Sequence, residues 1–431
     1  MKGIVLLCCL LAGIAHCRLL SAQDTLRLNR QQCENIFLKE NLLLIAERLN
    51  IDRAQALHLQ ARLWPNPTFT LDQVNFWATP GQLEGMDGVP PLFGKFGRNQ
   101  EFCSELEQLI LTAGKRKKLM AIEQVSVDMA GEYFEELLRN LKIEFRKSVT
   151  ELQYLQRYRD IYADEVSSLQ TLIRAYSNQV DQGNVGQGEY IRLRALLMEI
   201  NKEINNVTKE INLVQRELKT LMRLNPAAIL IVEETDYIPD VSMIRSLNLN
   251  NLLEQARENR PDLKIAQLEE NYHNRVWEYE KAQRMPNVTL KAAYDRGGNA
   301  MLNFVGFGFS MDLPFFNRNQ GNIKHAQIGI EQAKIMNEQQ QLTVQNSVTL
   351  AYQNLFASLS FMETIDPGYE ASLDKLLQSY TRNFASRNIS MLEYIDFLNA
   401  YLDNKKIIIE SGRDVNNNFE ELQYEIGKDL N

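Results

Sequence analysis

One stretch of this chain occurs twice, and this duplication limits the possible folds more than any other feature. Residues 176–197 are YSNQVDQGNVGQGEYIRLRALL, and residues 380–401, 204 positions later, are YTRNFASRNISMLEYIDFLNAY. In each copy a long helical pattern leads into a short turn containing Gly or Asn, and a second helical pattern follows. The duplication predicts two helical hairpins with turns at about 177–189 and 381–393.

The helices beside these turns carry the apolar spacing of coiled coils. After the first turn, apolar residues alternate at intervals of four and three: Leu193, Leu197, Ile200, Ile204, Val207, Ile211, Val214, Leu218 and Leu221. Before it, residues 115–176 contain no Pro and one Gly. A continuous helix of this length would extend about 90 Å, far longer than an ordinary globular helix.

The duplication extends to the whole chain. We expect a first repeat at 23–224, a linker at 225–248 and a second repeat at 249–431. Each repeat contains a helix, two strands, a long helix, a turn and a helix, which gives a fold that is mainly α with a small β part. The strands are expected at about 68–77, 102–111, 287–295 and 302–313. Helix breaks are expected near 50–52, at Pro261 and at 366–368.

The strands have the alternation of membrane strands. Val305, Phe307 and Phe309 would lie on one face, with Gly306 and Gly308 on the other. Four strands of about ten residues can cross a bilayer but cannot close a barrel, and open edges are not tolerated in lipid. Two copies would give eight strands and a filled interior, whereas three would give twelve strands and a lumen. The pattern therefore predicts a barrel shared between chains.

The N-terminus predicts export. Residues 1–22 have the basic start, apolar run and small-residue cleavage site of a signal peptide; cleavage before Cys17 with lipidation of that residue is the alternative. The net charge of −8 becomes more negative when Lys2 and Arg18 are removed, which argues against nucleic-acid binding. The basic run at 114–118 lies between a strand and a helix, where it would contact lipid headgroups or form a solvated turn.

No pattern indicates an enzyme, a cofactor or a metal site. Cys33 and Cys103, which remain after signal removal, make no disulfide framework. His58, His273 and His325 have no partner at ligand spacing, and no catalytic arrangement of nucleophile, base or paired carboxylates is present.

Several motifs together resemble one family. WPNP at 64–67, MPN at 285–287, DLPFFNRNQGNI at 312–323 and the two turn sequences are similar to the TolC family of outer-membrane efflux channels, nearest its CzcC-like cation-efflux branch. The resemblance implies a homotrimer with a twelve-stranded barrel in outer-membrane lipid and a helical tunnel in the periplasm. It also implies two partners, a periplasmic adaptor and an inner-membrane pump of the resistance-nodulation-division type.

The resemblance also implies roles at the turns, where polar and ionic links close the tunnel. The candidates for this gate are Asp181, Glu189, Tyr380, Arg382 and Arg387, with Arg382 or Arg387 pairing with an acid or a backbone carbonyl across the hairpins. Ordinary solvated charges are the alternative. The candidate residues for adaptor docking are Gly183, Val185, Gly186, Asn388, Ile389 and Ser390.

The sequence leaves the substrate open among cations, drugs and secreted proteins. A type I secretion channel is one alternative. An exported coiled-coil scaffold that never enters the membrane is the other.

Overall fold

The computed structural model describes residues 25–75, 92–93, 100–233, 237–297 and 301–430. The predicted signal peptide, Cys17, Trp77 and most of the loop between the expected strands at 68–77 and 102–111 lie outside these residues. The chain forms two compact units: unit 1 contains Met1–Glu47, Phe134–Pro261 and Gln341–Asn431, and unit 2 contains Arg48–Tyr133 and Asp262–Gln340. Each unit takes segments from both sequence repeats.

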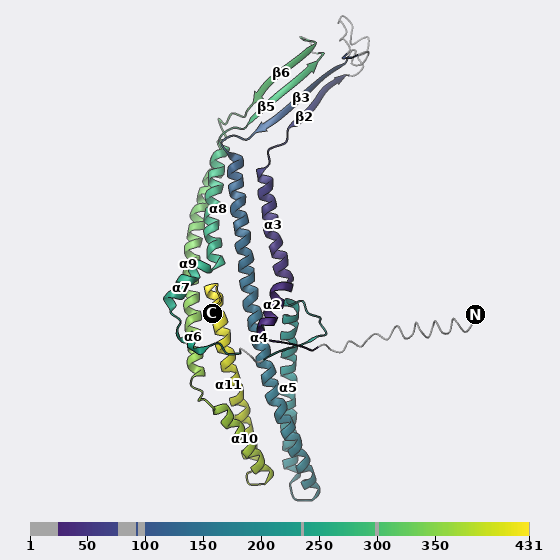
Figure 1. Ribbon diagram of the computed structural model, residues 1–431, viewed down its shortest axis with the longest axis vertical. Coiled ribbons are helices and arrows are strands. Elements are labelled where there is room, and N and C mark those ends of the chain that lie inside the picture. The colour runs from purple at the N-terminus through teal and green to yellow at the C-terminus, as the bar shows by residue number, and fades with distance from the viewer. Residues whose placement is uncertain (1–24, 76–91, 94–99, 234–236, 298–300, 431) are drawn as a thin grey trace, which may run out of the picture. The chain divides into compact units, whose positions relative to one another are not determined.

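The described residues are mainly helical (Figure 1). The helices are α2 (Arg30–Glu40), α3 (Leu42–Arg62), α4 (Lys115–Asp181), α5 (Gln187–Leu221), α6 (Val241–Arg245), α7 (Leu249–Asn259), α8 (Pro261–Gln283), α9 (Gln320–Met362), α10 (Tyr369–Ala385) and α11 (Met391–Ile426). The strands are β1 (Thr25–Leu28), β2 (Thr68–Asn75), β3 (Glu101–Ile110), β4 (Ile229–Val232), β5 (Val288–Arg296) and β6 (Asn303–Ser310).

Unit 2 contains one antiparallel sheet with the strand order β2-β3-β5-β6 (Figure 1). The pairing of β3 with β5 joins the strand pairs of the two repeats, and Leu106 lies opposite Ala292. The outer strands β2 and β6 each have one neighbour among the described residues.

The sheet presents an apolar face, as the alternation of β6 predicts. Val305, Phe307 and Phe309 are all exposed, Phe307 to 85%. On β2, Phe69 and Leu71 are also exposed, and the strand register places them in line with Phe307 and Val305. A bulge then follows at Gln73, whose φ is 51°, and the register with β3 shifts there.

The first residues of α4 bond to the segments next to the sheet in unit 2. The basic run at 114–118 was expected to contact lipid headgroups or to form a solvated turn, but two of its residues bond to groups of the protein instead. Lys115 is 4% exposed, and its Nζ donates to the Met285 carbonyl at 2.6 Å and to Asn287 Oδ1 at 2.7 Å. Arg116 donates to the Arg62 carbonyl and lies over the Trp64 ring. These two side chains therefore bond to carbonyl groups of the protein, one at the end of α3 and one between α8 and β5, which need donors.

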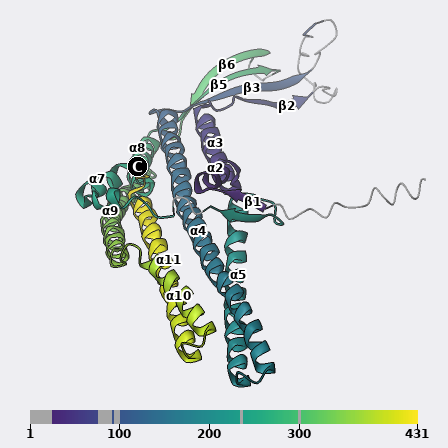
Figure 2. The ribbon, with the colours of Figure 1, turned by 60° about the horizontal axis from the view of Figure 1, so that its bottom comes forward.

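Unit 1 contains both helical hairpins, α4 with α5 and α10 with α11 (Figure 2). Residues of all four helices form one apolar core. Within it the Tyr176 ring stacks on Phe384 at 5.1 Å, and Phe384 stacks on Tyr394 at 4.7 Å. Helix α4 runs unbroken for 67 residues, which agrees with the absence of Pro from this segment.

The break in the first helical segment lies at Asn41, so the expected break near 50–52 was wrong. Asn41 is 2% exposed; its Oδ1 accepts from the N–H groups of Leu43 and Leu44, and its Nδ2 donates to the Leu221 carbonyl. This side chain caps the start of α3. Residues 50–52 remain helical, and Asn50 accepts a bond from Arg53 on the helix surface.

The linker at 225–248, which the sequence left irregular, contains β4 and α6. Strand β4 pairs in parallel with β1, with Leu26 opposite Leu230. The described residues therefore hold more elements than the four strands and six helical segments expected. The breaks expected at Pro261 and 366–368 are present, between α7 and α8 and between α9 and α10.

None of the helices among the described residues is both long and apolar enough to cross a membrane. The same residues contain no cluster of three His, Cys, Asp or Glu side chains suited to a metal ion.

Candidate functional site at the helical tips

The two hairpin turns in unit 1 have the same backbone hydrogen bonds. In the first turn, Gly183 N donates to the Val180 carbonyl at 2.9 Å, and Asn184 N donates to Gln179 at 2.9 Å. In the second, 204 positions later, Arg387 N donates to Phe384 at 3.0 Å, and Asn388 N donates to Asn383 at 2.8 Å. Both turns are Schellman motifs, which require a left-handed residue after the helix.

That left-handed position is where the two turns differ. Gly183 has a φ of 75°, which costs glycine nothing, whereas Arg387 has a φ of 61° with a full side chain. An L-residue in this region costs about 1 kcal/mol or more. Arg387, which carries this strain, is also one of the five gate candidates. Glycine at this position would adopt the same φ without backbone cost.

The Arg387 side chain crosses from one hairpin to the other. Its Nη2 donates to Gln179 Oε1 at 2.9 Å. The acceptor is a side-chain amide, where the sequence pointed to an acid or a backbone carbonyl. A hollow of about 330 Å³ adjoins this bond and is lined by residues of both hairpins, including Tyr176 and Val185.

The other gate candidates do not make such a link. Arg382 Nε donates to the Gln378 carbonyl of its own helix at 3.2 Å. Tyr380 stacks on Phe397 with ring centroids 4.0 Å apart, inside its own hairpin. Asp181 and Glu189 are exposed on the first turn. Of the five candidates, Arg387 is the one that the structure places across the hairpins.

The adaptor-docking candidates divide into two kinds. Gly183, Gly186, Asn388 and Ser390 are exposed, whereas Val185 and Ile389 are half-buried and pack against the apolar core of the hairpins. Ser390 begins α11 with a capping box to Glu393, in which each side chain bonds the other residue's backbone N–H. Gly186, at the equivalent position of the first turn, makes no side-chain cap.

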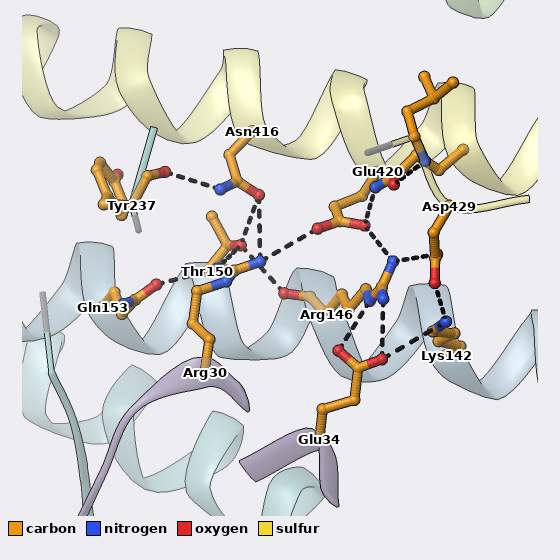
Figure 3. A network of polar contacts seen from close by, with 12 residues as sticks. Arg30, Glu34, Lys142, Arg146, Thr150, Gln153, Tyr237, Asn416, Glu420 and Asp429 are labelled. Carbon is orange, nitrogen blue, oxygen red and sulfur yellow. Dashed lines mark hydrogen bonds and ion pairs between the residues drawn. The ribbon is translucent and has the colours of Figure 1, made fainter. Parts of the chain in front are cut away.

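Sequence reasoning missed a buried polar network in unit 1 (Figure 3). Arg146 on α4 donates to both oxygens of Glu34, to Glu420 at 3.1 Å and to Asp429 at 2.8 Å. Arg30 donates to Thr150 Oγ1 at 2.8 Å and also approaches Glu420. These bonds join α2, α4, α11 and the residues after α11.

The network shifts the pKa values of its members. Burial lowers the pKa of Arg30, and the charge of Glu420 only partly opposes it. Burial also acts against the ionised form of Asp429, but the bonds from Lys142 and Arg146 outweigh it and hold the Asp429 pKa below its usual range. Each cation of the network has a carboxylate partner, so that none of these buried positive charges is left uncompensated.

A local signal could have found part of this network. Arg30 lies three residues before Cys33 and seven before Phe37, on the same helical face, and both of those residues are fully buried. A charged residue on a buried face requires a partner. Its partners on α4 and α11 are more than 100 residues away in the sequence, so the pattern alone could not name them.

Comparisons with known proteins agree with this architecture. Residues 252–423 match the sequence model of the outer membrane efflux protein family. The structure matches crystal structures of CusC with a TM-score of 0.72 and 17% identity, over 93% of this chain and 92% of that one. The second half of the chain is thus similar in sequence to outer membrane efflux proteins, and the whole chain has the fold of the TolC-like efflux channels.

Other solved structures share the fold of this chain. Vibrio cholerae VceC matches with a TM-score of 0.68 and 15% identity, over 92% of this chain and 96% of that one. The open state of the Neisseria gonorrhoeae MtrE outer membrane channel matches with a TM-score of 0.67 and 14% identity, over 92% and 88%. A search of curated protein sequences finds no match.

The matched family model describes an outer membrane efflux protein, and the solved structures that share the fold include outer membrane channels. These similarities support an outer-membrane location with the helical part in the periplasm, and a role other than enzyme.

Proposed function

We propose that three copies of this chain complete a twelve-stranded barrel in the outer membrane and form a conduit from the periplasm to the exterior. The observation that carries the proposal is the four-stranded sheet with one neighbour at each outer strand. Its exposed face carries Phe69, Val305, Phe307 and Phe309. In lipid, the unpaired edges of β2 and β6 would each leave backbone groups unsatisfied, at several kcal/mol a group.

The subunit number follows from barrel geometry. Two copies supply eight strands, and a barrel of that size is filled by its own side chains. Three copies supply twelve, which leaves a lumen. Solved structures of the same fold carry the description of outer membrane or transmembrane channels, and this supports the larger assembly.

The conduit would receive its substrate from partners. A periplasmic adaptor would dock at the exposed tip residues Gly183, Gly186, Asn388 and Ser390, and an inner-membrane pump of the resistance-nodulation-division type would supply the energy. Cations or drugs are the proposed substrates. The cation preference rests on the resemblance to the CzcC-like branch.

The closed state would be held in part by Arg387. Its bond to Gln179 joins the tip of α4 and α5 to the tip of α10 and α11. If the hairpins separate when the tunnel opens, this bond breaks.

Single-channel conductance in planar bilayers tests the conduit and its gate together. We expect discrete current steps from the purified protein, and a larger mean conductance for Arg387→Ala. Thr171→Ala, an exposed change on α4 that leaves the tips intact, is the matched control. Purified protein that gives no current steps would favour the non-inserting scaffold, and an unchanged Arg387→Ala conductance would place the gate elsewhere.

A further inference from the structure

Unit 1 contains a cavity that the channel function does not use. It has a volume of about 700 Å³ and lies among α4, α10 and α11. Its apolar walls are Ile161, Leu377 and the Tyr401 ring, and its polar wall includes Ser168 and Gln378. A cavity of this size accommodates a small organic molecule.

A buried carboxyl group lines this cavity without a partner. Glu165 is 6% exposed, and its Oε2 accepts no hydrogen bond from the described residues. Among the described residues, no cation forms an ion pair with Glu165. A buried carboxylate in this state costs several kcal/mol unless it is protonated or gains a donor.

Charged side chains near Glu165 already bond to other groups of the protein. Asp374 on α10 receives Lys405 Nζ at 2.8 Å and the Tyr401 hydroxyl at 2.9 Å. Lys405 also bonds Glu370 at 2.9 Å, and Arg382 donates to its own helix. The lining residue Asp164 adds a further negative charge. A ligand that brings its own donor and positive charge therefore fits the site.

We propose that this cavity binds a protonated organic amine with an apolar body, with the ammonium group donating to Glu165. The ammonium would meet the unpartnered oxygen, and the body would lie against Ile161, Leu377 and the Tyr401 ring, where aromatic faces also favour a cation. A metal ion fits less well, because the described residues hold no set of three converging metal ligands. The ligand would contact α4 of one hairpin and α10 and α11 of the other.

The proposal makes binding depend on pH. Burial, followed by the charges of Asp164 and Asp374, raises the pKa of Glu165 to about 7. The facing cations, Arg382 on α10 and Lys405 on α11, do not pair with it. An ammonium binds the ionised carboxylate, so affinity rises as pH increases from 6 to 8, while the amine itself stays protonated.

The test uses the full-length mature protein in detergent and the fluorescent amine dansylcadaverine. We expect saturable binding that Glu165→Gln weakens about tenfold or more, the value of one charge-assisted hydrogen bond. Asp160→Asn, which neutralises an exposed carboxylate on the same helix, should leave affinity unchanged. N-acetylated dansylcadaverine, which has the same ring and no charge, should bind about tenfold or more weaker.

Two measurements on the unchanged protein keep the proposal falsifiable if Glu165→Gln fails to fold. Equal affinity for dansylcadaverine and its N-acetylated form would show that the cavity recognises only the apolar body of the probe, and this would overturn the proposal. Affinity that is flat between pH 6 and 8 would overturn it as well. Because binding is measured without any membrane or conductance step, failure here leaves the channel proposal standing, and failure of the channel leaves this site standing.

Discussion

At the scale of single residues, the two turns show how a duplicated sequence can keep one backbone with different side chains. Gly183 and Arg387 occupy the same left-handed position, and the hydrogen bonds around them are the same. The sequence could predict the turns, because Gly and Asn gather there. It could not predict the bond from Arg387 to Gln179, because this contact joins two hairpins that lie 208 positions apart in the sequence.

The strain at Arg387 can be measured with two substitutions. Arg387→Ala and Arg387→Gly both remove the bond to Gln179, but only glycine adopts a φ of 61° without cost. We expect Arg387→Gly to be about 1 kcal/mol more stable than Arg387→Ala in thermal unfolding. The two variants should share one conductance. Equal stability would show that the turn relaxes to another conformation.

Glu165 predicts a pH dependence of stability. Its pKa is about 7 in the folded chain, raised by burial and then by Asp164 and Asp374 from an ordinary value of 4.5. The folded state therefore holds a proton that the unfolded state loses. Stability from this group is full below pH 4.5 and falls as pH rises toward 7, by up to about 3 kcal/mol.

Glu165→Gln should remove this loss, since the amide stays neutral. We expect the melting temperature of the variant to exceed that of the unchanged protein at pH 8 and to match it at pH 4.5. Asp160→Asn, which changes an exposed carboxylate on the same helix, should leave the pH profile as it was. A pH profile that Glu165→Gln does not alter would contradict the assignment.

At the scale of elements, local chemistry predicted most of what the structure contains. Pro261 separates α7 from α8, and the Asp366-Pro367-Gly368 segment separates α9 from α10, because proline cannot continue the helical bonds. Strand alternation placed β5 and β6 within a few residues. The elements that the sequence did not predict have one cause in common, because each of them depends on partners that are distant in the sequence. Strand β1 has four residues and forms only against β4, 204 positions away.

The break at Asn41 is the sharpest of these cases. Its amide caps α3 and also donates to the Leu221 carbonyl, 180 residues away. We expect Asn41→Ala to lower the free energy of unfolding by about 1–3 kcal/mol, because it removes the cap and leaves a buried carbonyl unsatisfied. Asn50→Ala, at the break expected from the sequence, should cost about 0.5 kcal/mol or less in chemical denaturation. A larger loss of stability for Asn50→Ala than for Asn41→Ala would contradict the role given to Asn41.

At the scale of the whole molecule, the sequence repeats and the compact units do not coincide. Each repeat runs through both units, so that residues of both repeats build the sheet of unit 2 and the paired hairpins of unit 1. The duplication was readable from the sequence because it is a property of the sequence. The partition was not, because it follows from pairings such as β3 with β5 and from the Arg146 network.

A shared barrel requires that the open sheet of one chain be completed by two others. Light scattering tests this requirement by giving the mass of the detergent-extracted mature protein before and after heating. We expect three chain masses before heating and one after it, since heat would separate a barrel whose edges are shared. One chain mass before heating, or an elongated dimer in the soluble fraction, would contradict the shared barrel.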